Sequence, residues 1–136
     1  MEGKLRLEIV TPYGLVFTED VDEITATSTE GEFGVLSGHV PFITILKIGM
    51  LTYKKGKDIG YIFVNSGYAE VLSDRVIILA DSAEKSEDID VERAIAAKKR
   101  AEERLKEAEK IDFTRAAASL ERASIRIQLA GKRIPR

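Results

Sequence analysis

The stretch Ile89-Asp90-Val91-Glu92-Arg93-Ala94 marks the point at which the hydrophobic pattern of the chain changes from a period of two to a helical period. Its aspartate is a natural helix N-cap, because an Asp side chain accepts hydrogen bonds from the free amides of a first helical turn. The pattern recurs in outline at Ile111-Asp112-Phe113-Thr114-Arg115-Ala116. We therefore expect two helices after about residue 88, with Asp90 and Asp112 as their N-caps.

Alanines at helical spacing line one face of each expected helix. The two stripes are Ala94, Ala97, Ala101, Leu105 and Ala108, and then Ala116, Leu120, Ala123, Ile127 and Ala130. The short connection Glu109-Lys110-Ile111 indicates an antiparallel hairpin, and Gly131 indicates the end of the second helix. Burial contributes about 25 cal/mol per Å² of apolar area, and alanine has little of it, so we expect helices that part at modest cost.

The part of the chain before about residue 80 alternates apolar and polar residues, as half-buried strands do. The segment KLRLEI at residues 4–9 shows this alternation. Further strand-forming runs, separated by turn residues, lie at 21–27, 43–46, 50–53, 61–64, 68–72 and 76–79. Short strands at this spacing predict an antiparallel sandwich or barrel. We therefore predict an α+β protein, with an antiparallel β-sandwich over residues 1–85 and an antiparallel two-helix hairpin over residues 86–136.

The composition allows a hydrophobic core and excludes several kinds of site. The 136 residues are 44% hydrophobic, which is normal for one globular domain with an appendage. The absence of cysteine excludes disulfides and thiolate zinc sites, and the single histidine, His39, leaves no His-rich metal site. The chain opens without an apolar signal segment, and no run approaches about 18 apolar residues, so we expect neither secretion nor membrane insertion.

The distribution of charge indicates an anionic protein or a nucleotide as partner. The net charge is −2, but acidic residues predominate before residue 90 and basic residues predominate after it. The basic part contains a single aromatic residue, Phe113, and therefore no platform on which nucleic acid bases stack. We expect no nucleic acid partner.

No catalytic constellation is recognisable in the sequence. There is no Ser-His-Asp set beyond His39 alone, no GxxxxGK[ST] loop, no GxGxxG after a strand and no HExxH. We therefore expect a chain that is not an enzyme on its own and that requires no cofactor.

The arginines that follow Asp90 have two interpretations, and the residues alone leave both open. One is a capped helix with surface arginines. The other is a nucleotide site, in which arginine forks bind phosphate, Asp90 accepts from an adenine amino group or a ribose hydroxyl, and Ile89 packs on the base. The segment Glu30–Phe42 is equally open, either as two tight turns around a short strand or as a loop edge that meets another subunit.

Two motifs are similar to those of one known family. Gly31–Phe42, GEFGVLSGHVPF, resembles the EGxxGxxPGHxPL signature of the epsilon subunits of F-type ATP synthases, and Ile89–Ala94 resembles their (I/L)DxxRA motif. Gly49-Met50-Leu51 and Leu79-Ala80-Asp81 fall where that family has similar residues, so the resemblance covers essentially the whole chain. Ser37 departs from the pattern, since the family usually has proline there.

The resemblance implies a ten-stranded β-sandwich followed by a helical hairpin, in the rotating central stalk of a bacterial proton-translocating ATP synthase. The sandwich would dock on the gamma subunit and the c-ring. The hairpin would face gamma and the α/β catalytic hexamer, and it would inhibit ATP hydrolysis when it opens. The chain would lie peripherally at the cytoplasmic face of the bacterial inner membrane.

The resemblance also assigns residues. Glu32 and His39 lie in loops that family members place near the c-ring. Some bacterial members bind ATP between the folded helices as a regulatory ligand, and the corresponding positions here are Glu84, Ile89, Asp90, Arg93, Arg100, Arg122 and Arg126. Arg104 and Arg115 have similar places on the helices but are not in that set. Two alternatives remain: a structural stalk adaptor that binds no nucleotide, and a free-standing ATP-sensing module.

Overall fold

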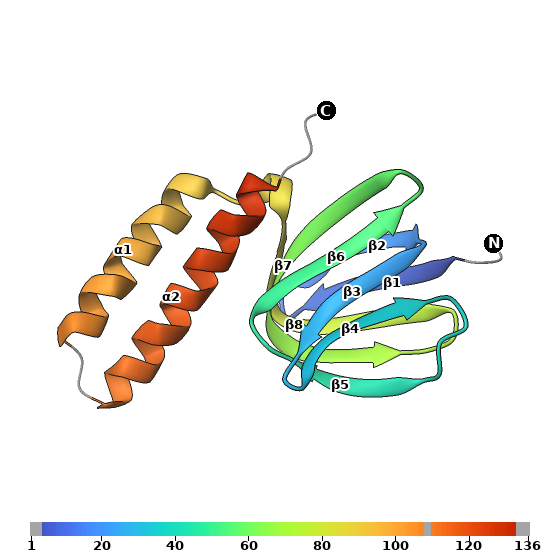
Figure 1. Ribbon diagram of the computed structural model, residues 1–136, viewed down its shortest axis with the longest axis horizontal. Coiled ribbons are helices and arrows are strands. Elements are labelled where there is room, and N and C mark those ends of the chain that lie inside the picture. Colours follow the sequence, from blue (N-terminus) through green and yellow to red (C-terminus); the bar gives the residue numbers. More distant parts are fainter. Residues whose placement is uncertain (1–3, 108–109, 133–136) are drawn as a thin grey trace.

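In the computed structural model, which describes residues 4–107 and 110–132, the strands come first and the helices last, as the sequence predicts (Figure 1). The eight strands of these ranges are β1 (Leu5–Thr11), β2 (Gly14–Val21), β3 (Glu23–Ser28), β4 (Gly31–Leu36), β5 (Phe42–Leu46), β6 (Gly49–Lys55), β7 (Asp58–Val71) and β8 (Arg75–Lys85). A short 3-10 helix, η1 (Ser86–Asp88), leads into α1 (Val91–Glu107) and α2 (Lys110–Gly131). The first helix thus begins inside the stretch where the sequence changes its period.

Two long strands, β7 and β8, pass through both layers of a β-sandwich. The first part of β7 pairs with β6, and its last part, Gly67–Val71, pairs with β5. The first part of β8 pairs in parallel with β1, and its last part, Ser82–Lys85, pairs with the first part of β7. One layer therefore runs β2-β1-β8-β7-β5 and the other β8-β7-β6-β3-β4. The predicted sandwich is confirmed. Each layer has five strand segments, and eight continuous strands supply the ten expected segments because β7 and β8 each contribute to both layers.

The bend of β7 lies at Ser66 and Gly67, where the sequence predicted a turn between two strands. Both residues have positive φ, 47° and 138°. A Cβ at Gly67 would lie 1.9 Å from the carbonyl oxygen of Leu79 and 2.9 Å from the Cα of Ala80, so glycine is what allows β7 to cross β8 this closely. The prediction of a turn that ends the strand is wrong, because the same residue types also make a bend inside one strand.

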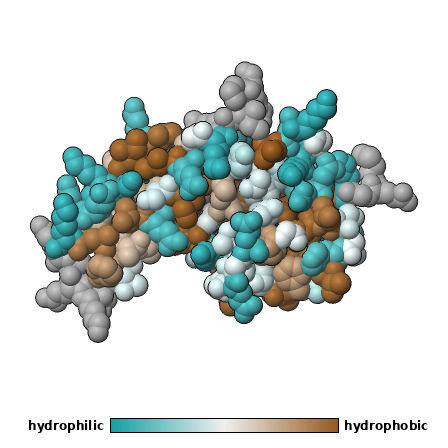
Figure 2. All heavy atoms as spheres, in the orientation of Figure 1, coloured by the Kyte–Doolittle hydropathy of each residue, from teal (hydrophilic) through white to brown (hydrophobic). Residues whose placement is uncertain are grey.

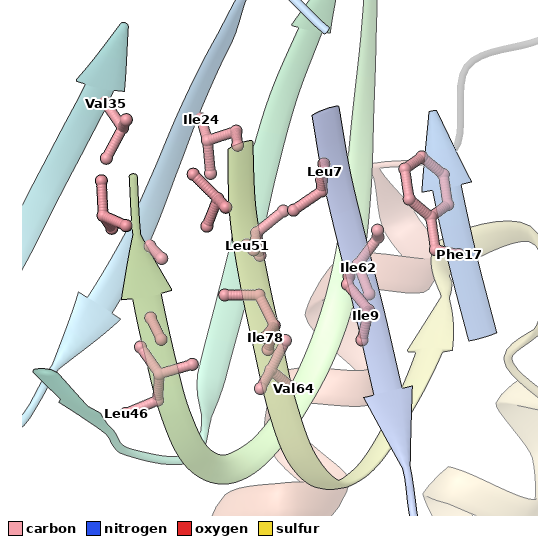
Figure 3. Packing of buried hydrophobic residues seen from close by; sticks show 14 of the residues in the cluster. Leu7, Ile9, Phe17, Ile24, Val35, Leu46, Leu51, Ile62, Val64 and Ile78 are labelled. Atoms are coloured by element: carbon pink, nitrogen blue, oxygen red, sulfur yellow. The ribbon is translucent and has the colours of Figure 1, made fainter. Parts of the chain in front are cut away.

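Apolar side chains of both layers meet in one core (Figure 3). Leu5, Leu7 and Ile9 of β1 have no exposed surface, which confirms the alternation seen in the sequence. They pack with residues of the other strands, among them Ile24, Leu51, Ile62 and Ile78. Because this core lies between the layers, the outer face of each layer is left for other contacts.

The two helices lie side by side as an antiparallel pair, with α2 between α1 and the sandwich (Figure 1). Four alanines with at most 3% of their surface exposed mark the seam between the helices: Ala94 and Ala101 of α1, and Ala116 and Ala123 of α2. We refer to these four residues as the alanine seam. The predicted stripes are confirmed at these positions, whereas Ala108 lies outside the described residues.

The second helix starts earlier than expected. It begins at Lys110, so Asp112 is its third residue and not its N-cap. Neither Lys110 nor Ile111 strongly disfavours helical backbone, so the helix extends upstream and only two residues join it to α1. The N-cap prediction for Asp112 is therefore wrong, and the connection is shorter than the expected Glu109-Lys110-Ile111.

Asp22 ties together three parts of the sandwich. Its carboxylate pairs with the ammonium of Lys4, and its Oδ2 accepts a hydrogen bond at 2.7 Å from the backbone N–H of Gly56, in the turn between β6 and β7. The hydrogen bond from Lys4, followed by that from Gly56, holds the pKa of Asp22 below its usual value. Since the folded-state pKa is lowered, this carboxylate stabilises the fold above its unfolded pKa, and the contribution is lost as the pH falls through the lowered pKa.

We expect Gly67→Ala to destabilise the sandwich by about 3–5 kcal/mol, because it combines backbone strain at positive φ with a clash against β8. Gly56→Ala is the matched control. Gly56 also has positive φ, 63°, but nothing lies within 4 Å of a Cβ built there, so we expect a loss of about 1 kcal/mol. Urea unfolding followed by circular dichroism measures both losses, and equal values would show that the close crossing of β7 and β8 imposes no constraint.

Candidate nucleotide site and docking surface

The N-terminus of α1 is capped as the sequence predicts. Asp90 Oδ1 accepts a hydrogen bond from the backbone N–H of Arg93 at 3.1 Å, and the Asp90 carbonyl accepts one from Ala94 at 3.0 Å. The side chains of Asp90 and Arg93 are exposed. The cap is therefore confirmed, and it leaves an acidic and a basic group accessible at the start of the helix.

Ile89 lies in a second apolar cluster, between the hairpin and the sandwich. It is 3% exposed and packs with Phe63 of β7 and Leu129 of α2, neither of which has exposed surface. Partly buried residues complete the cluster: Ile48, Met50, Tyr61, Ile125 and Ala130. In this conformation Ile89 offers almost no surface to a nucleotide base, and it holds the start of α1 against the sheet.

Glu84 and Arg126, which are 42 residues apart in the sequence, meet over Phe63. Arg126 Nε donates to Glu84 Oε1 at 2.7 Å, and the guanidinium carbon of Arg126 lies 4.3 Å from the centre of the Phe63 ring. The strand register places Phe63 opposite Glu84, so the sheet positions both partners of the arginine. The side chains of Arg126 and Glu84 are 25% and 34% exposed, so water still screens the ion pair.

The other three predicted arginines have no such partner. Arg93 and Arg100 lie on the exposed surface of α1, and an Arg122 guanidinium nitrogen of α2 donates to Ser119 Oγ at 3.1 Å. Within residues 4–107 and 110–132, none of the three forms an ion pair with a carboxylate. The structure therefore gathers Glu84, Ile89 and Arg126 around Phe63 and leaves the other four predicted residues along the hairpin.

Arg93 and Arg100 of α1 and Arg122 of α2, which form no ion pair with a carboxylate of the described residues, make the hairpin a cationic surface. Each guanidinium presents its N–H donors in a planar fork that fits phosphate oxygens. In the described part of the chain, no group of three or more His, Asp or Glu side chains is placed to hold a metal ion. The arrangement suits the binding of an anionic ligand.

The sequence-based prediction missed the apolar and aromatic side of this region. Phe63 lies under Arg126, and the ring centre of Tyr61 lies 5.5 Å from the ammonium of Lys132. A signal for this was available, because Tyr61–Val64 is apolar on both strand faces, a pattern typical of strands that are covered on both sides. Leu129 lies four residues after Ile125, on a helix face that the alanine stripe did not reveal.

Glu32 and His39 lie at one edge of the sandwich. Glu32 is exposed on β4, an edge strand that pairs with β3 among the described strands. His39 is half-buried in the loop after β4, where its Nδ1 lies 2.8 Å from the carbonyl oxygen of Val40 and its ring centre lies 5.2 Å from that of Phe42. The two residues predicted to contact the c-ring therefore lie close together in the chain, one on the edge strand β4 and the other in the loop that follows it.

The outer face of the layer β2-β1-β8-β7-β5 carries a line of apolar side chains, here named the apolar row. The strand register aligns its five members across the sheet in the order Leu15, Val10, Leu79, Tyr68 and Ile45. Four of them are more than half exposed, and Val10 is half-buried. The neighbouring row is mixed in polarity and consists of Thr18, Glu8, Ile77, Glu70 and Ile43.

An apolar line across five strands is about 19 Å long at the usual spacing of about 4.8 Å between strands. Figure 2 shows hydrophobic side chains at the surface over β5, at the lower right of the molecule. Continuous exposed apolar surface of this kind indicates a docking surface for another protein. No helix in the described ranges is long and apolar enough to cross a membrane.

Two family models match the chain in consecutive ranges. Residues 4–86 match the beta-sandwich domain of the ATP synthase delta/epsilon chain. Residues 87–131 match the long alpha-helix domain of the same chain.

Curated relatives and solved structures are similar along most of the chain. The ATP synthase epsilon chain of Thermodesulfovibrio yellowstonii is 59% identical over 100% of both chains. The ATP synthase epsilon chain of Geotalea daltonii is 58% identical over 78% of this chain and 77% of its own length. A chain of the Euglena gracilis mitochondrial ATP synthase shares the fold, with a TM-score of 0.81 at 24% identity over 96% of this chain and 82% of its own.

The resemblance inferred from Gly31–Phe42 and Ile89–Ala94 is confirmed by these matches. Both domains match in chain order, and a relative is 59% identical along its full length. The chain therefore belongs to the ATP synthase delta/epsilon family as an epsilon chain, a non-catalytic subunit of that enzyme.

Proposed function

We propose that the chain is a rotor and regulatory subunit in the central stalk of a bacterial proton-translocating ATP synthase, held peripherally at the cytoplasmic face of the inner membrane. Its sandwich docks on the gamma subunit and the c-ring. Its hairpin binds ATP when folded and inhibits ATP hydrolysis by the α/β hexamer when open. The observation that carries this proposal is the set of arginines on both helices that have no acidic partner among the described residues.

Arginines without carboxylate partners favour a ligand that brings negative charge. Arg93 and Arg100 of α1 and Arg122 of α2 have no carboxylate partner among the described residues. Arg126 of α2, which pairs with Glu84, completes the predicted set, so a triphosphate bound by all four arginines joins the two helices. Asp90, exposed at the start of α1, supplies an acceptor for an adenine amino group or a ribose hydroxyl. The helix cap and the arginines together therefore provide the donors and acceptors that a nucleotide requires.

A ligand that contacts both helices stabilises only the folded hairpin. At a free concentration of about one hundred times Kd, such binding contributes about 2.7 kcal/mol to the folded state. At low ATP the hairpin opens, and its basic residues meet acidic surface on the catalytic subunits, where opposite charge orients the association. Inhibition then follows from the loss of a ligand that holds the helices together.

Calorimetric titration of the isolated chain with ATP is expected to show binding that Arg93→Ala and Arg122→Ala each weaken at least about tenfold, because each removes a charged phosphate donor. Arg104→Ala is the control. Arg104 is exposed on α1 but lies outside the predicted set, so its removal is expected to change the affinity by less than about twofold. Absence of binding heat at millimolar ATP would reject the nucleotide site and favour the structural stalk adaptor.

The apolar row supports docking of the sandwich on gamma. Covering exposed apolar surface is favourable by about 25 cal/mol per Å², and a partner subunit is what removes this row from water. Glu32 and His39 belong to β4 and the loop after it, a different part of the sandwich, which we assign to the c-ring. The two surfaces allow one small domain to contact two rotor components at once.

We expect Leu79→Glu to reduce co-purification of the chain with gamma at least about tenfold, because an unpaired carboxylate is strongly disfavoured in an apolar interface. Leu36→Glu is the matched control, since Leu36 is 59% exposed at the end of β4, in the part of the sandwich assigned to the c-ring, and Leu79 is 51% exposed. The Leu36 variant is expected to co-purify with gamma like the unmodified chain. Loss of gamma from both variants, or from neither, would mean that the apolar row is not the docking surface.

A further inference from the structure

The described contacts of α2 with the sandwich are concentrated near the C-terminal end of the helix. They come from Ile125, Arg126, Leu129 and Ala130, together with Lys132 directly after the helix. Their partners are Tyr61, Phe63 and Glu84 of the sandwich, and Ile89 just before α1. We name this region the terminal anchor. Phe113, near the start of the same helix, is 51% exposed. The C-terminal end of α2 is thus the end that is held to the sheet.

The terminal anchor and the alanine seam differ in the side chains that they bury. The anchor buries Phe63 and Leu129 completely and adds the 2.7 Å ion pair of Arg126 with Glu84. The seam buries alanines, and no side-chain hydrogen bond or ion pair of the described residues joins α1 to α2. A buried Leu or Phe removes far more apolar area from water than Ala, at about 25 cal/mol per Å², so the anchor is the stronger contact per residue.

The connectivity of the chain holds α1 at both ends. Its start follows Ile89, which is buried in the anchor itself. Its end, Glu107, is joined by two residues to Lys110, the first residue of α2. Three Cα–Cα steps of about 3.8 Å reach at most about 11 Å. The first helix therefore cannot leave as an intact helix while α2 stays docked, and a swing of the whole hairpin about Asp90 also lifts α2 from the sheet.

We propose that the terminal anchor, and not the alanine seam, is the gate that controls opening of the hairpin. The regulatory meaning of this gate rests on the proposed function, but the gate itself requires no nucleotide. Glu84 and Arg126 belong both to the anchor and to the proposed nucleotide site, so a nucleotide that engages Arg126 acts at the gate directly. The contacts of the alanine seam then set the free energy that separates α1 from α2 once the terminal anchor has come apart.

The test compares two Leu→Ala variants of the same helix. Leu129→Ala alters the anchor, where Leu129 has no exposed surface. Leu120→Ala alters the seam face, where the half-buried Leu120 follows Ala116 by four residues. The chain has no cysteine, so spin labels attach only at cysteines introduced in place of exposed Lys57 of the sandwich and exposed Arg104 of α1. Double electron–electron resonance of the full chain without nucleotide then gives the ratio of open to closed hairpin.

We expect Leu129→Ala to raise the open-to-closed ratio at least about tenfold, and Leu120→Ala to change it by less than about threefold. Equal or greater opening in the Leu120 variant, or no opening in the Leu129 variant, overturns the proposal. Amide exchange at Ile62 and Ile78 checks that the sandwich stays folded, since both residues are fully buried in its core. If Leu129→Ala unfolds the sandwich, Ile125→Ala replaces it, because Ile125 packs in the same cluster as Phe63 and Leu129 and is only partly buried.

The same measurement with ATP separates this proposal from the proposed function. If ATP leaves every ratio unchanged while the two leucine variants still differ, the nucleotide site fails and the gate stands. If ATP closes the hairpin but the two variants open equally, the nucleotide site stands and the gate fails.

Discussion

The burial of Phe63 on the outer face of the sandwich is the constraint on which the position of the hairpin depends. Its neighbours along β7, Ile62 and Val64, point into the main core, whereas Phe63 packs under Ile89 and Leu129. A strand that is apolar on both faces is stable only when both faces are covered. The hairpin is therefore the third layer of the fold, and releasing it exposes apolar surface on the sheet as well as on the helix.

The bend at Gly67 connects this covered face to the exposed one. Before the bend, β7 lies in the layer that carries the hairpin, and Phe63 faces α2. After the bend, the same strand lies in the other layer, and Tyr68 belongs to the apolar row. One continuous strand therefore contributes to both the hairpin platform and the candidate docking surface. Because the core between them is close-packed, the two surfaces are held in a fixed relation.

The fold was predictable from the sequence wherever one period held over a whole element. The alternation around Leu5 and Leu7 and the alanine stripes fixed the order and kind of the elements, and Asp90 is the cap that its position predicted. The bend at Gly67 was not predictable, because turn residues in a strand pattern indicate a reversal as readily as a bend. The prediction placed the start of α2 too late, at Asp112. The helix begins at Lys110, because neither Lys110 nor Ile111 prevents helical backbone.

The sequence indicated which residues belong to the candidate site, but it did not indicate which of them contact one another. Arg126 was expected to bind a ligand together with Glu84, and nothing in the local pattern indicates that these two side chains pair with each other over 42 residues. That contact depends on the docking of α2, which in turn depends on Leu129 and Phe63. Long-range pairs of this kind follow from packing rather than from periodicity, so they become visible only in the folded chain.

The partial exposure of the Glu84–Arg126 pair suits an arginine that exchanges partners. A fully buried ion pair leaves a costly unpaired charge when it is broken, of about 3–5 kcal/mol, whereas an exposed pair contributes about 1 kcal/mol or less. The side chains of Arg126 and Glu84 are 25% and 34% exposed, so the stability of their ion pair is closer to that of an exposed pair. The pair orients Arg126 over Phe63, and under the proposed function a phosphate can replace Glu84 as the partner of Arg126. In the proposed nucleotide complex, a triphosphate would repel the carboxylate of Glu84, which would gain more by accepting from a hydroxyl or amino group of the nucleotide. Under that proposal, Glu84 pairs with Arg126 in the absence of ligand and would accept from the uncharged part of the ligand in its presence.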